Sequence, residues 1–191
     1  MSSLEVYWAF LALIGTERIA ELLVARKSAR WSFARGAQEY GRRHYPFMVC
    51  LHVGLLAGCA LEPSLYLRPF IPWLGWPMLG IALGCQVVRW WCVATLGRRW
   101  NTRIIVVPDL PLVASGPYRR LKHPNYAAVV IEGIALPLVH TAWITAALFT
   151  LTNAALLRHR IRLEEDALGI RSDSRRDAGS ELQPWLPPAL H

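Results

Sequence analysis

Two polar strings in the C-terminal half of the chain hold the residue types that bind small charged molecules. The first reads GPYRRLKHPNY, at residues 116–126, and the second reads RIRLEE, at residues 160–165. Pro124 predicts the start of a helix, because the first helical position needs no amide hydrogen. A helix start presents free amide donors and a partial positive charge, which suits a carboxylate or a phosphate. Three basic residues stand beside it, Arg119, Arg120 and Lys122.

The second string supplies carboxylates. On a helix, Arg160 and Glu164 lie one turn apart, and Glu165 is adjacent to them. Two carboxylates close to arginines can remain ionised and can accept hydrogen bonds from vicinal hydroxyls or from an amine. Together the two strings predict a site for a zwitterionic or nucleoside-type cofactor. The alternative is an ordinary basic loop followed by a helix that carries surface ion pairs.

The composition indicates an integral membrane protein. Of the 191 residues 54% are hydrophobic and nine are Trp, yet 21 are Lys or Arg and the formal net charge is +8. A soluble domain of this length does not usually combine both extremes. The four cysteines all lie in apolar segments without CxxC spacing, which favours buried thiols over disulfides or a metal site. They are Cys50, Cys59, Cys85 and Cys92.

The hydropathy pattern predicts an all-α protein with about five membrane segments, where about 20 helical residues are needed to cross a bilayer. The segments are residues 6–24, 44–61, 77–96, 124–139 and 142–157. The last two are short, so we expect them to form a closely packed helical hairpin. Residues 26–43 are expected to form a loop, with or without a short surface helix, and 63–77 a connection. Residues 98–122 are expected to be an ordered loop with an extended piece at 104–107.

The distribution of basic residues predicts how the chain is oriented. Residues 26–43, residues 98–122 and the tail from 158 onward hold 18 of the 21 Lys and Arg residues. By the positive-inside rule these segments face the cytoplasm, which requires an external N-terminus and five spans in the cytoplasmic (inner) membrane. The polar strings then share the cytoplasmic side. Topology explains the basic character, so we expect no nucleic-acid partner.

Several charged residues fall inside the apolar segments. Glu17, Arg18 and Glu21 share one helical stripe of the first segment, and they form either an internally paired cluster or a wall of a polar cavity. Arg89 in the third segment needs a partner, for which Glu17 and Glu21 are candidates. Glu132 in the fourth segment either lines a substrate tunnel or pairs with Arg89.

GPYRRLKHPNY followed by RIRLEEDAL resembles the C-terminal signature of the isoprenylcysteine carboxyl methyltransferase family, over roughly residues 96–168. The resemblance implies an integral membrane enzyme that transfers a methyl group from S-adenosylmethionine to an oxygen of a lipophilic substrate. It implies that Glu165 binds the cofactor and that Arg160 lies beside the reacting carboxylate. It also assigns a cofactor pocket to His123, Pro124, Asn125 and Tyr126, with Tyr118 and Arg120 as further cofactor-side candidates.

Two departures from the family pattern bear on the substrate. Lys122 replaces the usual arginine, and the chain after Glu165 differs from that of the members that process prenylated proteins. The upstream strings at residues 36–52 and 97–108 look like a bacterial branch associated with type III polyketide synthases. That branch methylates alkylpyrones or phenolic lipids. We therefore expect a carboxylate or a pyrone or phenol hydroxyl as acceptor, in a membrane-embedded lipophilic molecule.

In this interpretation Arg160 holds the acceptor anion, with help from Asn101 or Arg103, and positioning supplies most of the acceleration. The chain divides into N-terminal membrane helices (1–97), a catalytic loop, hairpin and juxtamembrane helix (98–168), and a poorly ordered tail (169–191). Two other functions remain open. One is methylation of a phospholipid amine, and the other is a small proton-coupled transporter that uses Glu17, Glu21 and Glu132.

Overall fold

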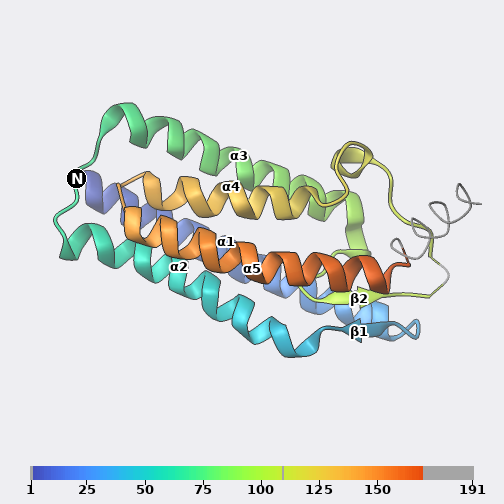
Figure 1. The fold of residues 1–191 in the computed structure, drawn as a ribbon. Helices are drawn as coiled ribbons and strands as arrows, with labels where there is room; N and C mark the ends of the chain where they lie inside the picture. Colours follow the sequence, from blue (N-terminus) through green and yellow to red (C-terminus); the bar gives the residue numbers. More distant parts are fainter. Residues whose placement is uncertain (1, 109, 170–191) are drawn as a thin grey trace, which may run out of the picture.

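Five long helices run side by side along one axis in the computed structural model, which describes residues 2–108 and 110–169 (Figure 1). They are α1 (Ser3–Phe33), α2 (Tyr45–Leu65), α3 (Pro72–Leu96), α4 (Pro124–Leu138) and α5 (Trp143–Ala167). Each predicted apolar segment lies in one of them, so the mostly helical fold is confirmed. Two stretches of the described chain, Arg42–Leu65 and Pro72–Arg99, are long and apolar enough to cross a bilayer. The number of spans stays a prediction.

Helix α1 continues well beyond the predicted segment, so the connection expected from residue 26 is wrong up to Phe33. Ala25, Ser28 and Ala29 are buried on one face of this extension. This face packs against the 3-10 turn η2 (Gly97–Arg99) and the strand β2 (Ile104–Val106). Tertiary burial therefore keeps the basic stretch helical, and the chain turns only near Gly36, whose φ is +74°.

The connection predicted at residues 63–77 is also shorter than expected. Helix α2 contains Pro63 in its last turn and ends at Leu65, and α3 begins with Pro72 at its first position. A proline at that position removes no helical hydrogen bond, because the first amide groups have no partner within the helix. Pro72 is thus compatible with the start of α3, whereas Pro63 lies inside α2 and costs that helix one backbone hydrogen bond close to its end.

A two-stranded antiparallel sheet ties the two basic connections together. Strand β1 (Gln38–Tyr40) pairs with β2, with Glu39 opposite Ile105. The extended piece expected at residues 104–107 is therefore confirmed. The short 3-10 turns η1 (Arg42–His44) and η3 (Gly116–Arg119) lie in the same two connections. The sheet, these connections and the C-terminal half of α5 share one end of the bundle (Figure 1), which is the arrangement that the polar strings require.

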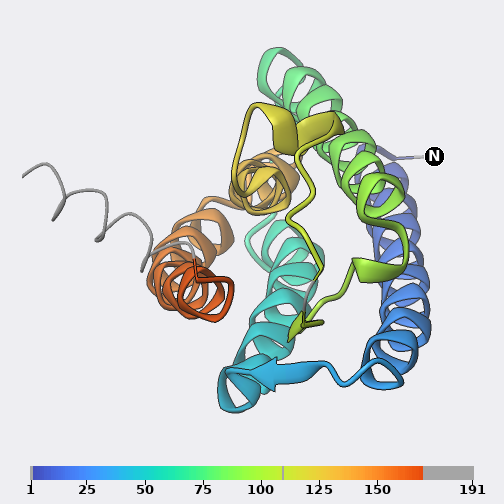
Figure 2. The ribbon, with the colours of Figure 1, turned by 90° about the vertical axis from the view of Figure 1, so that its right-hand side faces the viewer.

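Viewed along the bundle, α4 lies between α3 and α5, and the long connection crosses the end of the bundle in front of the helices (Figure 2). Helix α2 packs against both α1 and α5. The expected hairpin of the last two apolar segments is formed by α4 and α5, which turn at Val139–Ala142. The predicted tail lies outside the described residues beyond Gly169.

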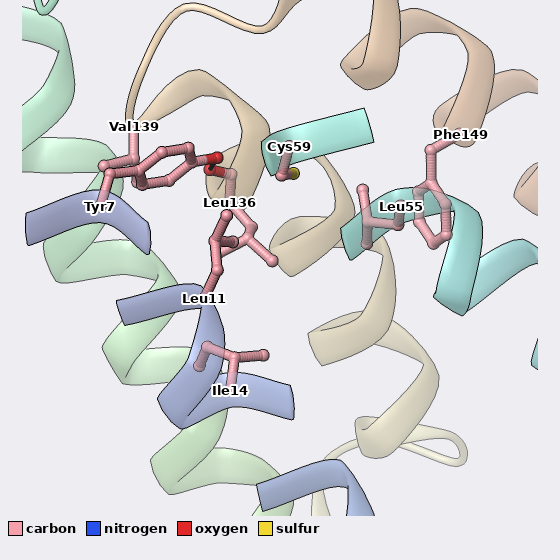
Figure 3. Close-up of a cluster of buried hydrophobic side chains, with 8 residues drawn as sticks. All are labelled: Tyr7, Leu11, Ile14, Leu55, Cys59, Leu136, Val139 and Phe149. Carbon is pink, nitrogen blue, oxygen red and sulfur yellow. Dashed lines mark hydrogen bonds between the residues drawn. The ribbon is translucent and has the colours of Figure 1, made fainter. Parts of the chain in front are cut away.

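The opposite end of the bundle is closed by a buried apolar cluster (Figure 3). Its members come from four of the helices and from the α4–α5 turn: Tyr7, Leu11, Ile14, Leu55, Cys59, Leu136, Val139 and Phe149. The Tyr7 hydroxyl donates to the Leu136 carbonyl over 2.9 Å, which satisfies the polar group within this core. The described cysteines are free thiols, and three of the four are buried.

Glu62 of α2 caps the start of α5. Its carboxylate accepts from the Ile144 amide at 3.1 Å and from the Thr145 amide at 2.7 Å. Replacing Glu62 with alanine leaves these helix-start donors unpaired and is expected to lower the free energy of unfolding by about 2 kcal/mol. Thermal unfolding in detergent micelles measures this. Ser64→Ala is the control, since that hydroxyl bonds only the Ala60 carbonyl of its own helix, and equal loss in both variants contradicts the cap.

Candidate active site

A cavity of about 610 Å³ extends from the sheet end of the bundle into its interior. Side chains from all five helices and from the connection between α3 and α4 line it. Its volume falls within the roughly 300–1,000 Å³ that is usual for small-molecule sites. Most of the cofactor-side residues predicted from the sequence are among the lining residues: Tyr118, His123, Pro124, Asn125, Tyr126 and Glu164. The predicted site thus coincides with a real cavity.

Tyr126, Arg160 and Glu164 form a hydrogen-bonded cluster at the outer part of this cavity. The Tyr126 hydroxyl donates to the Glu164 carboxylate and accepts from Arg160 Nε at 2.8 Å. Arg160 Nη2 donates to the Thr102 carbonyl at 2.6 Å, and Nη1 lies 2.9 Å from the Met48 sulfur. Only 5% of Arg160 is exposed. One guanidinium therefore links α5 to α4, to α2 and to the long connection.

His123 and Glu165 form a second pair beside the cluster. His123 Nε2 lies 3.4 Å from a Glu165 oxygen, and its ring stacks on Tyr126 with centroids 5.3 Å apart. Glu165 is not among the residues that line the cavity, whereas its neighbour Glu164 is. In this arrangement Glu165 orients His123, and Glu164 is the carboxylate that faces the cavity.

The start of α4 presents polar groups that have no partner. Pro124 carries no amide hydrogen, and the Asn125 amide makes no hydrogen bond with any described residue. The Asn125 Oδ1 atom is also buried without a partner. Unpaired buried polar atoms are rare in folded proteins and often mark a place where a ligand or water binds. Lys122 lines the same part of the cavity, so the anion-binding feature predicted at this helix start has the expected groups.

Tyr118 of η3 lines the cavity and lies against Cys92 of α3. Burial raises the pKa of the Tyr118 phenol well above its ordinary value. The hydroxyl is therefore protonated over the whole physiological range and is available as a donor. Arg120 is exposed and is not a lining residue, so the structure does not bring it to the other cofactor-side candidates.

The residues predicted to act on the substrate have structural partners of their own. Asn101 donates from Nδ2 to the Ala25 carbonyl at 3.3 Å and accepts from the Arg103 amide at 3.1 Å. The Arg103 guanidinium lies 3.1 Å from Glu39 of β1. Both side chains line the cavity, where they hold the long connection against α1 and the sheet.

Glu132 belongs to a buried ion-pair network deeper in the bundle. Arg18 Nη2 lies 2.6 Å from Glu132 Oε1, and Arg89 lies 3.9 Å from Oε2. The predicted pairing of Arg89 with Glu132 is therefore present, but the contact is longer than the one that Arg18 makes with Glu132. Arg89 makes its short contacts with Glu21, at 3.0 and 2.5 Å, which selects Glu21 from the two predicted candidates.

Comparisons with known proteins show the family to which this chain is related. A sequence model of the isoprenylcysteine carboxyl methyltransferase (ICMT) family matches residues 78–170. The uncharacterized protein YpbQ of Bacillus subtilis is 40% identical over 164 residues, which cover 85% of this chain and 96% of YpbQ. The chain belongs to the ICMT family. An uncharacterized protein of Haemophilus influenzae is 23% identical over 154 residues, or 79% of this chain and 88% of that protein.

Membership in the ICMT family makes the protein a membrane-associated methyltransferase. The ICMT match contains α4, α5 and most of α3, and with them both polar strings. Helices α1 and α2 lie outside it. The cavity, however, takes lining residues from α1 and α2 as well, among them Arg18, Met48 and His52.

The sequence interpretation missed several lining residues. Thr102 acts through its backbone carbonyl, which no pattern of residue types reveals. His52 is a lone histidine in an apolar segment, a pattern that by itself does not indicate a binding residue, yet it lines the cavity. Asn153 carried a usable signal, because it is an amide within the apolar segment 142–157 and lies seven residues, or about two helical turns, from Arg160.

Proposed function

We propose that the protein transfers a methyl group from S-adenosylmethionine to an anionic oxygen of a lipophilic molecule that enters from the membrane. The observation that carries this proposal is the cluster of Tyr126, Arg160 and Glu164 at a cavity that also exposes the unpaired Asn125 groups. A carboxylate, a guanidinium and a helix start then meet within one site. These are the groups that a cofactor with hydroxyls, a carboxylate and a cation requires.

The donor set fits S-adenosylmethionine, which supplies an electrophilic methyl group on a sulfonium when it is bound. Glu164 lines the cavity, and among the described residues its carboxylate accepts from the Tyr126 hydroxyl alone, so it has further lone pairs for ribose hydroxyls. The Asn125 amide and Lys122 suit the carboxylate of the amino-acid end. His123, held by Glu165, supplies a flat surface beside Tyr126.

Arg160 is placed to hold the acceptor oxygen. A carboxylate or an acidic pyrone or phenol hydroxyl is an anion or close to one near neutral pH, so a strong general base is dispensable. A fixed guanidinium can orient such an anion, and the three contacts of Arg160 with described residues keep it in one position. Orientation of this kind supplies most of the acceleration in a direct displacement.

The proposed acceptor oxygen and the cofactor meet at the end of the bundle that carries the sheet and the basic connections. Residues 26–43 and 98–122 lie toward this end of the bundle (Figure 1), and each range contains six Lys or Arg residues. The positive-inside rule then assigns the site to the cytoplasmic face of the inner membrane, where S-adenosylmethionine is present. A type III polyketide synthase remains a proposed supplier of the acceptor.

Cofactor binding tests the proposal directly. Wild-type protein in lipid nanodiscs is expected to bind labelled S-adenosylmethionine, and Glu164→Gln is expected to weaken binding about 10- to 100-fold, because hydrogen bonds to a charged group contribute about 1.5–3 kcal/mol. Arg119→Gln is the control, since Arg119 is exposed and does not line the cavity. No binding by the wild type, or no effect of Glu164→Gln, contradicts the proposal.

Mass analysis of the labelled lipid product then separates the two kinds of acceptor. A methyl ester or methyl ether supports oxygen methylation. A methylated phospholipid amine shows that the cavity accepts a different nucleophile, and it overturns the oxygen acceptor while leaving the cofactor assignment intact.

A further inference from the structure

The cavity has a second polar layer below the cluster of Tyr126, Arg160 and Glu164. Along α5 the lining residues include Asn153, Leu157, Arg160 and Glu164, which share one face of the helix. Asn153 and Arg160 are seven residues apart, which corresponds to about 10 Å along the helix axis. We call Asn153 and His52, together with the lining charges Arg18, Glu21, Arg89 and Glu132, the inner layer.

Asn153 turns its side-chain amide to the cavity. Only 4% of the residue is exposed, and no hydrogen bond joins its side chain to another residue of the described ranges 2–108 and 110–169. The amide lines the cavity rather than a helix contact. The donor and the acceptor of this amide are therefore open to a molecule in the cavity, which can complete their hydrogen bonds.

His52 faces the cavity from α2 with a defined polarity. Its Nδ1 atom lies 2.8 Å from the Met48 carbonyl oxygen, so Nδ1 carries the hydrogen and donates. In the neutral ring Nε2 is then an acceptor. The ring packs edge-on against Phe149, with centroids 5.5 Å apart, and Phe149 lies one helical turn from Asn153. His52 and Asn153 therefore line the same stretch of the cavity.

The remaining inner-layer residues are charged but mutually paired. Arg18 and Arg89 bond to Glu21 and Glu132, and Gln86 donates to Glu132 at 2.8 Å. The apolar side chains of Leu55, Leu136 and Phe149 line the cavity beside these charges. A purely hydrocarbon chain in the inner layer would remove water from these charges without replacing its hydrogen bonds, which is unfavourable.

We infer that the inner layer is a second site at which the protein binds the acceptor. It binds a hydroxyl group that the acceptor carries about 10 Å from the oxygen that is methylated. The hydroxyl donates its hydrogen to His52 Nε2 and accepts a hydrogen bond from Asn153 Nδ2. The acceptor is thus an amphipathic molecule with polar groups at two positions. This inference rests on the proposed function for the identity of the reacting end.

Two matched probes test the inference by binding alone. Para-(ω-hydroxybutyl)phenol and para-pentylphenol have the same number of heavy atoms, and the hydroxyl of the first stands about as far from the phenol as Asn153 stands from Arg160. Equilibrium dialysis against protein in nanodiscs, corrected with empty nanodiscs, measures both. The hydroxybutyl probe is expected to bind about tenfold more tightly, the effect of one hydrogen bond to an unpaired buried group.

Variants test whether Asn153 is responsible for the tighter binding of the hydroxybutyl probe. Asn153→Leu is expected to remove it, and Thr152→Leu, on the exposed side of the same helix, is expected to retain it. Binding of neither probe, equal binding of both, or an unchanged preference in Asn153→Leu overturns the inference. Binding of S-adenosylmethionine is measured on the same samples. If the cofactor binds while the preference is absent, only the inner-layer site is wrong; if the cofactor does not bind, the proposed function is wrong.

Discussion

Replacing Arg160 with lysine is expected to lower the rate constant of methyl transfer about 100- to 1,000-fold, the range found when one fixed donor to a reacting oxygen is removed. Arg160 reaches Tyr126, Thr102 and Met48 with three different nitrogens. A lysine ammonium is a single point charge on a flexible stem and cannot reproduce this planar set of contacts. The positive charge remains, so the expected loss reports on orientation.

The measurement is single-turnover transfer of a labelled methyl group to a lipid extract, with binding of S-adenosylmethionine measured in parallel. Arg158→Lys is the matched control, because Arg158 is exposed on the same helix and does not line the cavity. If the Arg160→Lys protein is monodisperse and transfers the methyl group at the wild-type rate, Arg160 has no role in the reaction. A variant that binds the cofactor normally but transfers slowly supports a role on the acceptor side.

The second large effect concerns the buried ion pairs. Arg89→Met is expected to lower the free energy of unfolding by about 3–5 kcal/mol, because the two buried carboxylates of Glu21 and Glu132 must then share a single arginine as partner. For a chain of this size that corresponds to a decrease of roughly 6–20 °C in the unfolding midpoint. Thermal unfolding in detergent, followed by Trp fluorescence, measures the change.

The double variant Glu21→Met with Arg89→Met is the informative comparison. It removes both partners of the 2.5 Å contact and leaves Arg18 with Glu132. Replacing a whole buried pair with apolar side chains is often neutral, so the double variant is expected to be more stable than Arg89→Met alone. If the two substitutions destabilise additively, Glu21 and Arg89 do not act as a pair.

Much of the fold followed from local chemistry. Pro124 was predicted to open the fourth helix, and it occupies the first position of α4. The β-branched piece at residues 104–107 was predicted to be extended, and it pairs with β1. The C-terminal end of α1 was not predicted, because its extension depends on burial of Ala25 and Ser28 beneath a connection that lies far away in the sequence. Helix α3 begins five residues before the predicted segment and ends at Leu96 as predicted.

The site was predicted less completely than the helices. The sequence placed Arg160, Glu164 and Glu165 in one string and favoured Glu165 for the cofactor. Residues adjacent on a helix point about 100° apart, so Glu164 follows Arg160 into the cavity while Glu165 turns toward His123. This assignment depends on the rotation of α5 against α4, which no local pattern encodes.

The sequence by itself determined a helical membrane protein, the two polar strings, and the need of the intramembrane charges for partners. Hydropathy, charge distribution and residue spacing within one segment suffice for these conclusions. Only the tertiary structure decided that Arg18 is the close partner of Glu132, that Asn153 and His52 share a cavity with Arg160, and that Glu164 faces it. Such pairings join helices far apart in the chain, and they depend on how the packed side chains set the rotation and depth of each helix.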